Sequence, residues 1–241
     1  MTINRALLFI GFPLLLALLC SLGMWQLNRA EQGERIHQQY DEESSRSAFS
    51  NLIPNGDIDE FRYRSIEVQG QYLSSKQFLL DSMTHEGRAG YHVLTPFKPM
   101  NSSEWVLVNR GWVEASSDRE VLPQVQVDEA MRLVRGRVDL LPQPGLYLGE
   151  SADSGLWPKV VLFPTFDTLE SRFESPLMHY QLLLDDGSSD GFLREWSPRV
   201  LPPERHIGYA IQWFSFAGVL AFMVIALWAR SRTRLNDEIG R

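Results

Sequence analysis

The sequence predicts two transmembrane α-helices, one near each end of the chain. They flank an antiparallel, β-rich extracytoplasmic domain, either an open sheet or a small barrel, with one short helix. Residues 6–27 and 207–229 contain no Asp, Glu, Lys or Arg. At a rise of about 1.5 Å per residue, each run makes a helix of about 33 Å, and a bilayer core measures roughly 30 Å. Residues 30–205 have the mixed polarity of a globular domain, and a domain of that length can bury its own core.

The first apolar run is predicted to stay as an anchor and not to be cleaved as a signal peptide. It exceeds the apolar core of a signal peptide, about 7–15 residues, and no small-residue cleavage site follows it. Its last residues include Met24, Trp25 and Leu27, bulky side chains that suit a membrane interface. Cys20 is the one cysteine of the chain, so neither a disulfide framework nor a Cys-x-x-Cys site is available.

Arginines beside the second run predict the orientation in the membrane. Arg230, Arg232 and Arg234 follow it directly, and Lys and Arg near membrane ends are enriched on the cytoplasmic side. Both termini are therefore predicted to be cytoplasmic, with residues 230–241 as a cytoplasmic tail. Residues 30–205 then lie in the periplasm, and the chain is a multi-pass protein of a bacterial inner (plasma) membrane.

The region between the two runs is acidic. Residues 30–206 hold 17 Lys and Arg against 28 Asp and Glu, a net charge of −11, while the whole chain carries −7. Nucleic-acid binding needs a basic surface, so the domain is not expected to bind nucleic acid.

Short strand-like runs separated by Gly and Pro turns predict the β-rich domain. They are residues 62–73, 77–81, 91–97, 104–113, 131–141, 157–163 and 180–185. In the first of these runs, strand alternation puts Ile66, Val68 and Tyr72 on one face and the polar residues between them on the other. Residues 24–47 hold good helix formers and no proline, so the first helix is predicted to continue beyond the membrane. Residues 51–59 are a cluster of helix breakers, and residues 166–173 form the short helix. No alternation of strands with helices is apparent, which favours antiparallel pairing.

Gly111 interrupts one of these strand-like runs. Glycine inside a strand is typical of a β-bulge or of a close approach by another backbone. A bend that specifies the fold is the simpler account of this position.

The sequence shows no catalytic signature. Gly-x-Ser-x-Gly, His-Glu-x-x-His and a phosphate-binding loop are all missing. The five histidines are scattered, without the clustering that a copper chaperone needs. We therefore expect a protein that is not an enzyme, with a membrane-tethered hydrolase as the less favoured alternative.

A histidine and several aromatic residues share one face of the second predicted membrane helix. His206, Tyr209 and Trp213 follow at helical spacing, and Gln212 is a polar residue within the apolar run. This face could hold a flat, apolar, iron-bearing macrocycle, with the neutral imidazole of His206 as axial metal ligand. The other interpretation is an aromatic belt, because Trp and Tyr are enriched at membrane interfaces.

Trp25, Gln26 and Arg29 lie at the same membrane level on the first helix. Arg29 is one helical turn from Trp25 and could bind either a haem propionate or a lipid phosphate. Both residues are candidates for cofactor binding.

Five motifs in order resemble the Surfeit locus protein 1 family of cytochrome c oxidase assembly factors. They are Gly-Met-Trp-Gln-Leu-Asn-Arg at 23–29, Arg-Tyr-Arg at 62–64 with Gly-Gln-Tyr at 70–72, the run at 87–97, Val-Leu-Val-Asn-Arg-Gly-Trp-Val at 106–113, and the run at 206–214. The resemblance covers nearly the whole chain and includes the layout with two spans. Glu114 departs from it, since many members have proline there.

The resemblance implies a non-enzymatic role in building the haem-copper oxidase, through supply or insertion of haem a. The implied partners are the catalytic subunit of the oxidase and haem a synthase, beside membrane lipid. The family's membrane-face histidine falls on His206, and its Trp and Arg fall on Trp25 and Arg29. A structural scaffold that holds oxidase subunits without binding haem fits the same layout.

Overall fold

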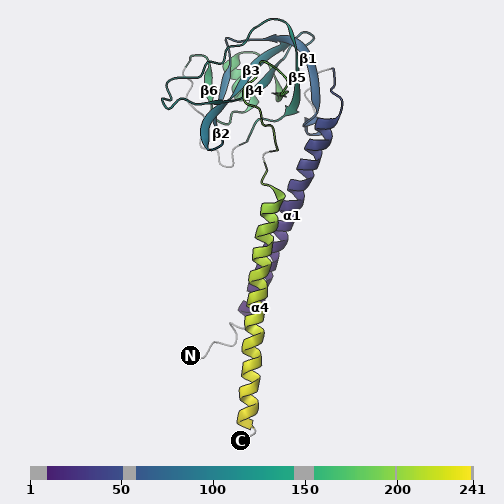
Figure 1. Cartoon of the computed structure of the whole chain (residues 1–241), viewed down its shortest axis with the longest axis vertical. Helices are drawn as coiled ribbons and strands as arrows, with labels where there is room; N and C mark the ends of the chain where they lie inside the picture. The colour runs from purple at the N-terminus through teal and green to yellow at the C-terminus, as the bar shows by residue number, and fades with distance from the viewer. Residues whose placement is uncertain (1–9, 51–57, 144–154, 199, 240–241) are drawn as a thin grey trace. The chain divides into compact units, whose positions relative to one another are not determined.

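The computed structural model describes residues 10–50, 58–143, 155–198 and 200–239 (Figure 1). The chain divides into two compact units. One unit is Gln39–Ser197, and the other combines the terminal segments up to Gln38 and from Pro198.

A closed barrel of five strands forms the centre of the unit Gln39–Ser197. Around the barrel the strand order is β1 (Ser65–Tyr72), β5 (Arg132–Asp139), β7 (Leu177–Leu184), β4 (Trp105–Glu114) and β3 (Arg88–Pro99). The barrel closes where Gly70–Tyr72 of β1 pairs with Phe97–Pro99 of β3. Of the two predicted arrangements, the small barrel is therefore confirmed.

Two further strands extend the sheet beyond β3. They are β2 (Phe78–His85) and β6 (Lys159–Val161), and β2 pairs with β3. Each of the seven strand-like runs in the sequence overlaps one observed strand, with ends that shift by a few residues. The short helix α3 (Phe166–Phe173) has the predicted bounds, while the one-turn helix α2 (Ile58–Phe61) was not predicted. Most of the predicted breaker cluster, residues 51–57, lies outside the described residues.

The prediction of a purely antiparallel sheet was wrong for two strand pairs. β4 and β7 are parallel, and so are β2 and β6. Parallel neighbours need a long crossover connection, which commonly contains a helix. Here α3 lies just before β7 in the chain and belongs to such a connection. The result is a mixed sheet.

Alternating side chains fill the barrel interior. On β1 the side chains of Ile66, Val68 and Tyr72 are buried, as predicted, while Gln69 and Gln71 are exposed. They join a cluster that includes Val106, Val108, Tyr180 and Leu182. A second cluster packs the apolar side of α3 against β2 and β4. The domain thus has its own hydrophobic core.

A β-bulge in β4 brings another backbone close to Gly111. Arg110 and Gly111 together oppose Val93, because the register shifts between the pairs His92–Trp112 and Leu94–Asn109. Gly111 has a φ of 109°, and a Cβ atom there would lie 2.5 Å from the carbonyl oxygen of Leu193. Only glycine fits both conditions. The predicted bulge and close approach are therefore confirmed.

The terminal unit consists mainly of two long helices. α1 (Phe12–Ser45) runs without a break from the apolar segment into the polar one, as predicted, and α4 is Pro203–Ile239. Within the described residues, Pro203–Arg230 is the one helical segment that is long and apolar enough to cross a membrane. This criterion rests on length and composition, and residues 6–9 of the predicted first span lie outside the described part. That first span stays a prediction.

Candidate functional site

α1 and α4 pack against each other along a seam with alternating spacings of three and four residues. On α1 the buried or half-buried positions include Leu16, Leu19, Gly23, Gln26, Ala30 and Gly33. On α4 they include His206, Ala210, Trp213, Ala217, Leu220 and Val224. This spacing is the heptad pattern of helices that cross at about 20°. Glycine and alanine in the seam let the two backbones approach closely, as is common between membrane helices.

The two helices are antiparallel. Gly33 of α1 lies beside Pro203 at the start of α4, and Gly23 lies beside Phe214 further along α4. Figure 1 shows the two helices side by side within this unit. The antiparallel packing brings Trp-Gln-Leu-Asn-Arg of α1 to the level of the first turns of α4.

His206 and Gln26 form a hydrogen bond across the seam. Nδ1 of His206 lies 2.8 Å from Oε1 of Gln26. Both side chains are half-buried, and their neighbours in the seam are Ala30 and Ala210. Sequence reasoning placed Gln26 at this membrane level but gave it no contact with His206. The signal that could have found it is a glutamine at a seam position of a mostly apolar helix.

The predicted aromatic face of α4 is divided between the seam and the exposed side of the helix. Trp213 is half-buried in the seam, and its ring meets that of Phe216 edge to face, with centroids 6.1 Å apart. Tyr209 is on the exposed side. Gln212 is also exposed. His206 and Trp213 therefore follow the same seam two turns apart, and Tyr209 lies beside it.

Trp25 and Arg29 lie on the exposed side of α1. The guanidinium carbon of Arg29 is 5.7 Å from the centroid of the Trp25 ring, within cation–π range. Arg29 Nη1 also donates a hydrogen bond of 3.0 Å to Oε1 of Gln32. An exposed guanidinium beside an indole suits an anionic group at a membrane surface. The two interpretations of Arg29, propionate or lipid phosphate, both fit this position.

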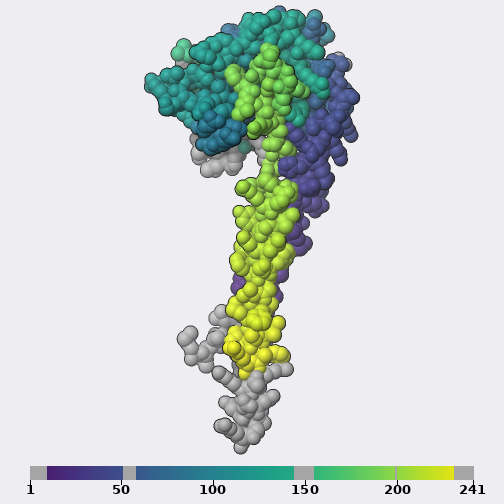
Figure 2. All heavy atoms as spheres, in the orientation of Figure 1, coloured from purple at the N-terminus to yellow at the C-terminus, as the bar shows by residue number. Residues whose placement is uncertain are grey.

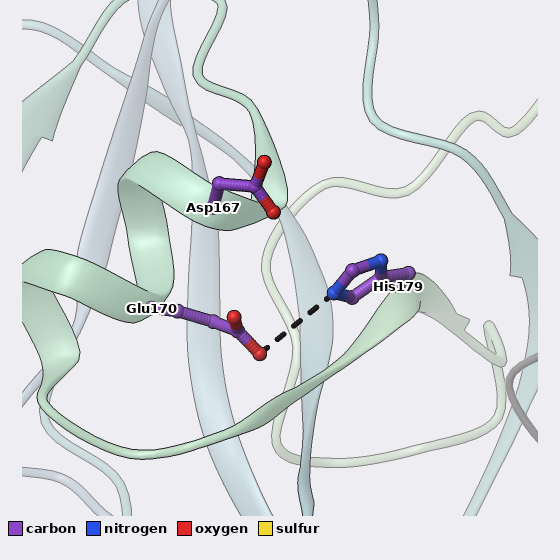
Figure 3. A group of neighbouring side chains, drawn as sticks. All are labelled: Asp167, Glu170 and His179. Atoms are coloured by element: carbon purple, nitrogen blue, oxygen red, sulfur yellow. Dashed lines mark ion pairs between the residues drawn. The ribbon is translucent and has the colours of Figure 1, made fainter.

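A separate cluster in the β domain holds three side chains of the types that ligate metals. Asp167 and Glu170 of α3 lie beside His179 of β7, with one possible ligand atom of each within 4.8 Å of the others (Figure 3). Glu170 is already engaged: its Oε1 accepts a 2.6 Å hydrogen bond from the backbone N–H of Leu177 and lies 3.8 Å from Nε2 of His179. The ring of His179 stacks on that of Phe166, with centroids 5.5 Å apart. These contacts explain the cluster as part of the packing between α3 and β7.

Arg110, next to the bulge glycine, is the most deeply buried cation of the described β domain. Its side chain is 4% exposed. Nη1 donates 2.7 Å to the carbonyl oxygen of Val125, and Nε donates 2.7 Å to that of Asp190. Burial lowers the pKa of the Arg110 guanidinium from its ordinary value, which still leaves it charged at neutral pH. Arg110 thus fastens two loops to the bulge of β4.

The sequence that forms these helices and the β domain can be compared with known protein families. The model of the SURF1 family matches residues 14–218, which include most of α1, the whole described domain and the first part of α4, up to residue 218. The chain belongs to the SURF1 family. This confirms the resemblance found in the motifs, and all five candidate residues of the helix pair lie within the matched range.

Related family members come from distant organisms. A SURF1-like protein of Rickettsia conorii is 26% identical over 243 residues, which cover 98% of this chain and 94% of that protein. A SURF1-like protein of Monosiga brevicollis is 22% identical over 230 residues, which cover 91% of this chain and 85% of that protein. A shorter segment is 29% identical to the cytochrome oxidase assembly protein SHY1 of Saccharomyces cerevisiae, over 27% of this chain and 16% of that protein.

Proposed function

We propose that this protein is an assembly factor for haem-copper cytochrome c oxidase, which holds haem a transiently for delivery to the catalytic subunit. Membership of the SURF1 family and the similarity to a yeast oxidase assembly protein support the assembly role. The contact between Gln26 and His206 is the observation that supports a haem site in the helix pair.

The helix pair carries the residue types that would hold a haem: a histidine for the iron, aromatic rings for the macrocycle and an arginine for a propionate. With Nδ1 of His206 hydrogen-bonded to Gln26, the other ring nitrogen would be the one to bind the haem iron. Trp213 and Tyr209 would offer apolar surface to the macrocycle from α4, and Trp25 would offer a ring from α1. Arg29 would bind a propionate through charge-assisted hydrogen bonds. The haem supplies the iron, and the chain holds and orients it without chemical conversion.

The proposed setting is the inner membrane of a bacterium. α4 carries large apolar side chains along its exposed surface, and it is the yellow-green helix of Figure 2. Such a surface suits lipid or the membrane helices of a partner. His206 comes directly before the apolar run, so in this proposal it lies at the membrane surface. In this proposal both termini are cytoplasmic, the domain is periplasmic, and the apolar part of α1 spans the membrane in addition to α4.

The proposed partners are the catalytic subunit of the oxidase, which receives the haem, and haem a synthase, which supplies it. Haem is apolar and reactive, so a direct transfer within the membrane avoids release into water. Nucleic acid is not a proposed partner, because residues 30–206 carry a net charge of −11. The carrier role is non-enzymatic.

Haem content per protein tests this function. Wild type, His206→Ala and His179→Ala would be purified in mild detergent, reconstituted with hemin and compared by absorbance. His179 is the matched control, because it is a partly exposed histidine of the β domain. We expect His206→Ala to lose most of the bound haem and His179→Ala to retain it. Equal haem content in all three proteins would exclude His206 as ligand and favour a scaffold that does not bind haem.

Two further variants examine the rest of the face. Trp213→Ala should weaken haem affinity but keep the spectrum of a histidine-ligated iron, since packing is lost while the ligand stays. Arg29→Ala should have a milder effect, because it removes at most one charge-assisted contact of about 1.5–3 kcal/mol.

A further inference from the structure

The hydrogen bond between Gln26 and His206 defines which ring nitrogen carries the proton. In the amide orientation that places Oε1 of Gln26 2.8 Å from Nδ1 of His206, the amide oxygen can only accept a hydrogen bond, so the shared proton belongs to Nδ1. A neutral imidazole carries one N–H, which leaves Nε2 with a lone pair. Among the residues that the structure describes, Nε2 of His206 has no hydrogen-bond partner.

We infer that Gln26 is a positioning residue that holds His206 in the Nδ1–H tautomer and directs the lone pair of Nε2 toward a metal. A metal ligand must present an unprotonated nitrogen, and the hydrogen bond at the other nitrogen decides which one that is. In a histidine free in water the Nε2–H tautomer predominates, so without Gln26 the ligating nitrogen would mostly carry a proton. The identity of the metal, haem iron, rests on the proposed function, whereas the tautomer is a property of the protein without ligand.

The packing of the helices fixes this contact in place. Gln26 and His206 both lie in the seam, flanked by Ala30 on α1 and Ala210 on α4, whose side chains are buried. With small residues on both sides, the backbones are held close and neither helix can rotate without losing contact. The imidazole ring is therefore held from its Nδ1 side, and its Nε2 side keeps a constant direction.

Nitrogen NMR of the protein without haem tests the tautomer directly. The full chain, with ¹⁵N-labelled histidine, would be studied in detergent micelles, and the spectrum of His206→Ala identifies the signals of His206. We expect wild type to show a protonated Nδ1 and an unprotonated Nε2. Gln26→Met should shift the population toward Nε2–H, while Gln26→Glu, which keeps an acceptor, should retain the wild-type tautomer.

The matched control is Gln212→Met. It removes the same functional group from the exposed side of α4, and the His206 signals should not change. Gln26→Asn serves as a second variant. The asparagine side chain is shorter by one methylene, so its amide stays polar but no longer reaches Nδ1 of His206. An unchanged His206 tautomer in both Gln26→Met and Gln26→Asn overturns the inference.

Hemin titration separates this inference from the proposed function. Loss of a hydrogen-bond partner behind a metal ligand typically costs about 10–100-fold in affinity. We expect Gln26→Met to weaken hemin binding to that degree, yet to keep the histidine-ligated spectrum at saturation, and Gln26→Glu to lower the reduction potential of the bound iron. If His206→Ala binds haem as wild type does, the proposed function fails while the tautomer result stands. If the tautomer is insensitive to residue 26 but His206→Ala loses haem, the inference alone fails.

Discussion

The ring of Phe214 on α4 rests directly on the backbone of Gly23 on α1. A Cβ atom at Gly23 would lie 2.6 Å from Cζ of this ring and 2.7 Å from Cε1, far inside van der Waals contact. Gly23 has ordinary helical geometry within α1, so the absence of a side chain is required by the neighbouring helix. This contact lies one turn from Gln26 and sets how closely the two helices approach at that level.

Substitution of Gly23 by leucine should therefore force the helices apart. Overpacking of a close contact typically costs about 1–3 kcal/mol, and we expect Gly23→Leu to lower the thermal stability of the helix pair in detergent. Phe214→Ala should restore part of the loss, because it removes the ring that the new side chain meets. The double-mutant cycle, read by helical circular dichroism during melting, should give a coupling of about 0.5–3 kcal/mol. Strictly additive effects would mean that the two residues do not touch.

Arg110 should be essential for the stability of the β domain. Its replacement by methionine keeps the length of the side chain but leaves the carbonyl oxygens of Val125 and Asp190 without their buried donor. Each orphaned polar group costs about 1–3 kcal/mol, so for the two oxygens we expect a loss of about 2–6 kcal/mol in the free energy of unfolding. This difference in the free energy of unfolding can be measured by urea denaturation of the purified proteins, with tryptophan fluorescence as the readout.

The matched control for that experiment is Arg88→Met. The side chain of Arg88 is 51% exposed and pairs with the exposed carboxylate of Glu114. Exposed ion pairs contribute about 0–1 kcal/mol, so this variant should unfold almost like wild type. Similar destabilisation by both substitutions would contradict the role given to Arg110.

The order of elements could be predicted from the sequence because it depends on local patterns. The alternation of Ile66, Val68 and Tyr72 predicts β1, and the short helix predicted at residues 166–173 is α3. Strand partners depend on long connections that leave no local trace, which is why the parallel pairing of β4 with β7 was missed. The same holds for the site: His206 stood out in the sequence, while its partner Gln26 is 180 residues away and becomes visible only when the helices pack.

The buried hydroxyl of Tyr72 should lower the free energy of unfolding of the β domain at alkaline pH. Burial, and secondarily the charge of Asp190, raise the pKa of the Tyr72 hydroxyl above its ordinary value. The folded domain thus keeps this proton while an unfolded tyrosine loses it above about pH 10. Below that pH, both states hold the Tyr72 proton and the free energy of unfolding is unaffected by this group. As the pH rises further, the unfolded state binds fewer protons than the folded state, so the free energy of unfolding falls.

Tyr72→Phe tests this pH dependence. The variant should lose less stability between pH 9 and 11, roughly the window around the ordinary tyrosine pKa. At neutral pH it should be as stable as wild type or more so, since no hydrogen-bond partner of the buried Tyr72 hydroxyl is found among the described residues. The pKa values of Tyr40 and Tyr63 are also raised, mainly by burial, so some alkaline loss should persist. An alkaline profile identical to wild type would assign the effect to other groups.

The orientation in the membrane is the last prediction, and it rests on charge. Arg230, Arg232 and Arg234 follow the apolar part of α4, and basic residues at a membrane end are retained in the cytoplasm. A green fluorescent protein exported through the general secretion pathway does not fluoresce in the periplasm. A fusion after Arg241 should therefore be bright, and a fusion at Asn101, in the turn between β3 and β4, should be dark. Replacement of the three arginines by glutamine should weaken this difference, because the bias is carried by their charge. A bright fusion at Asn101 would place the β domain in the cytoplasm and with it the Gln26–His206 pair at the cytoplasmic face.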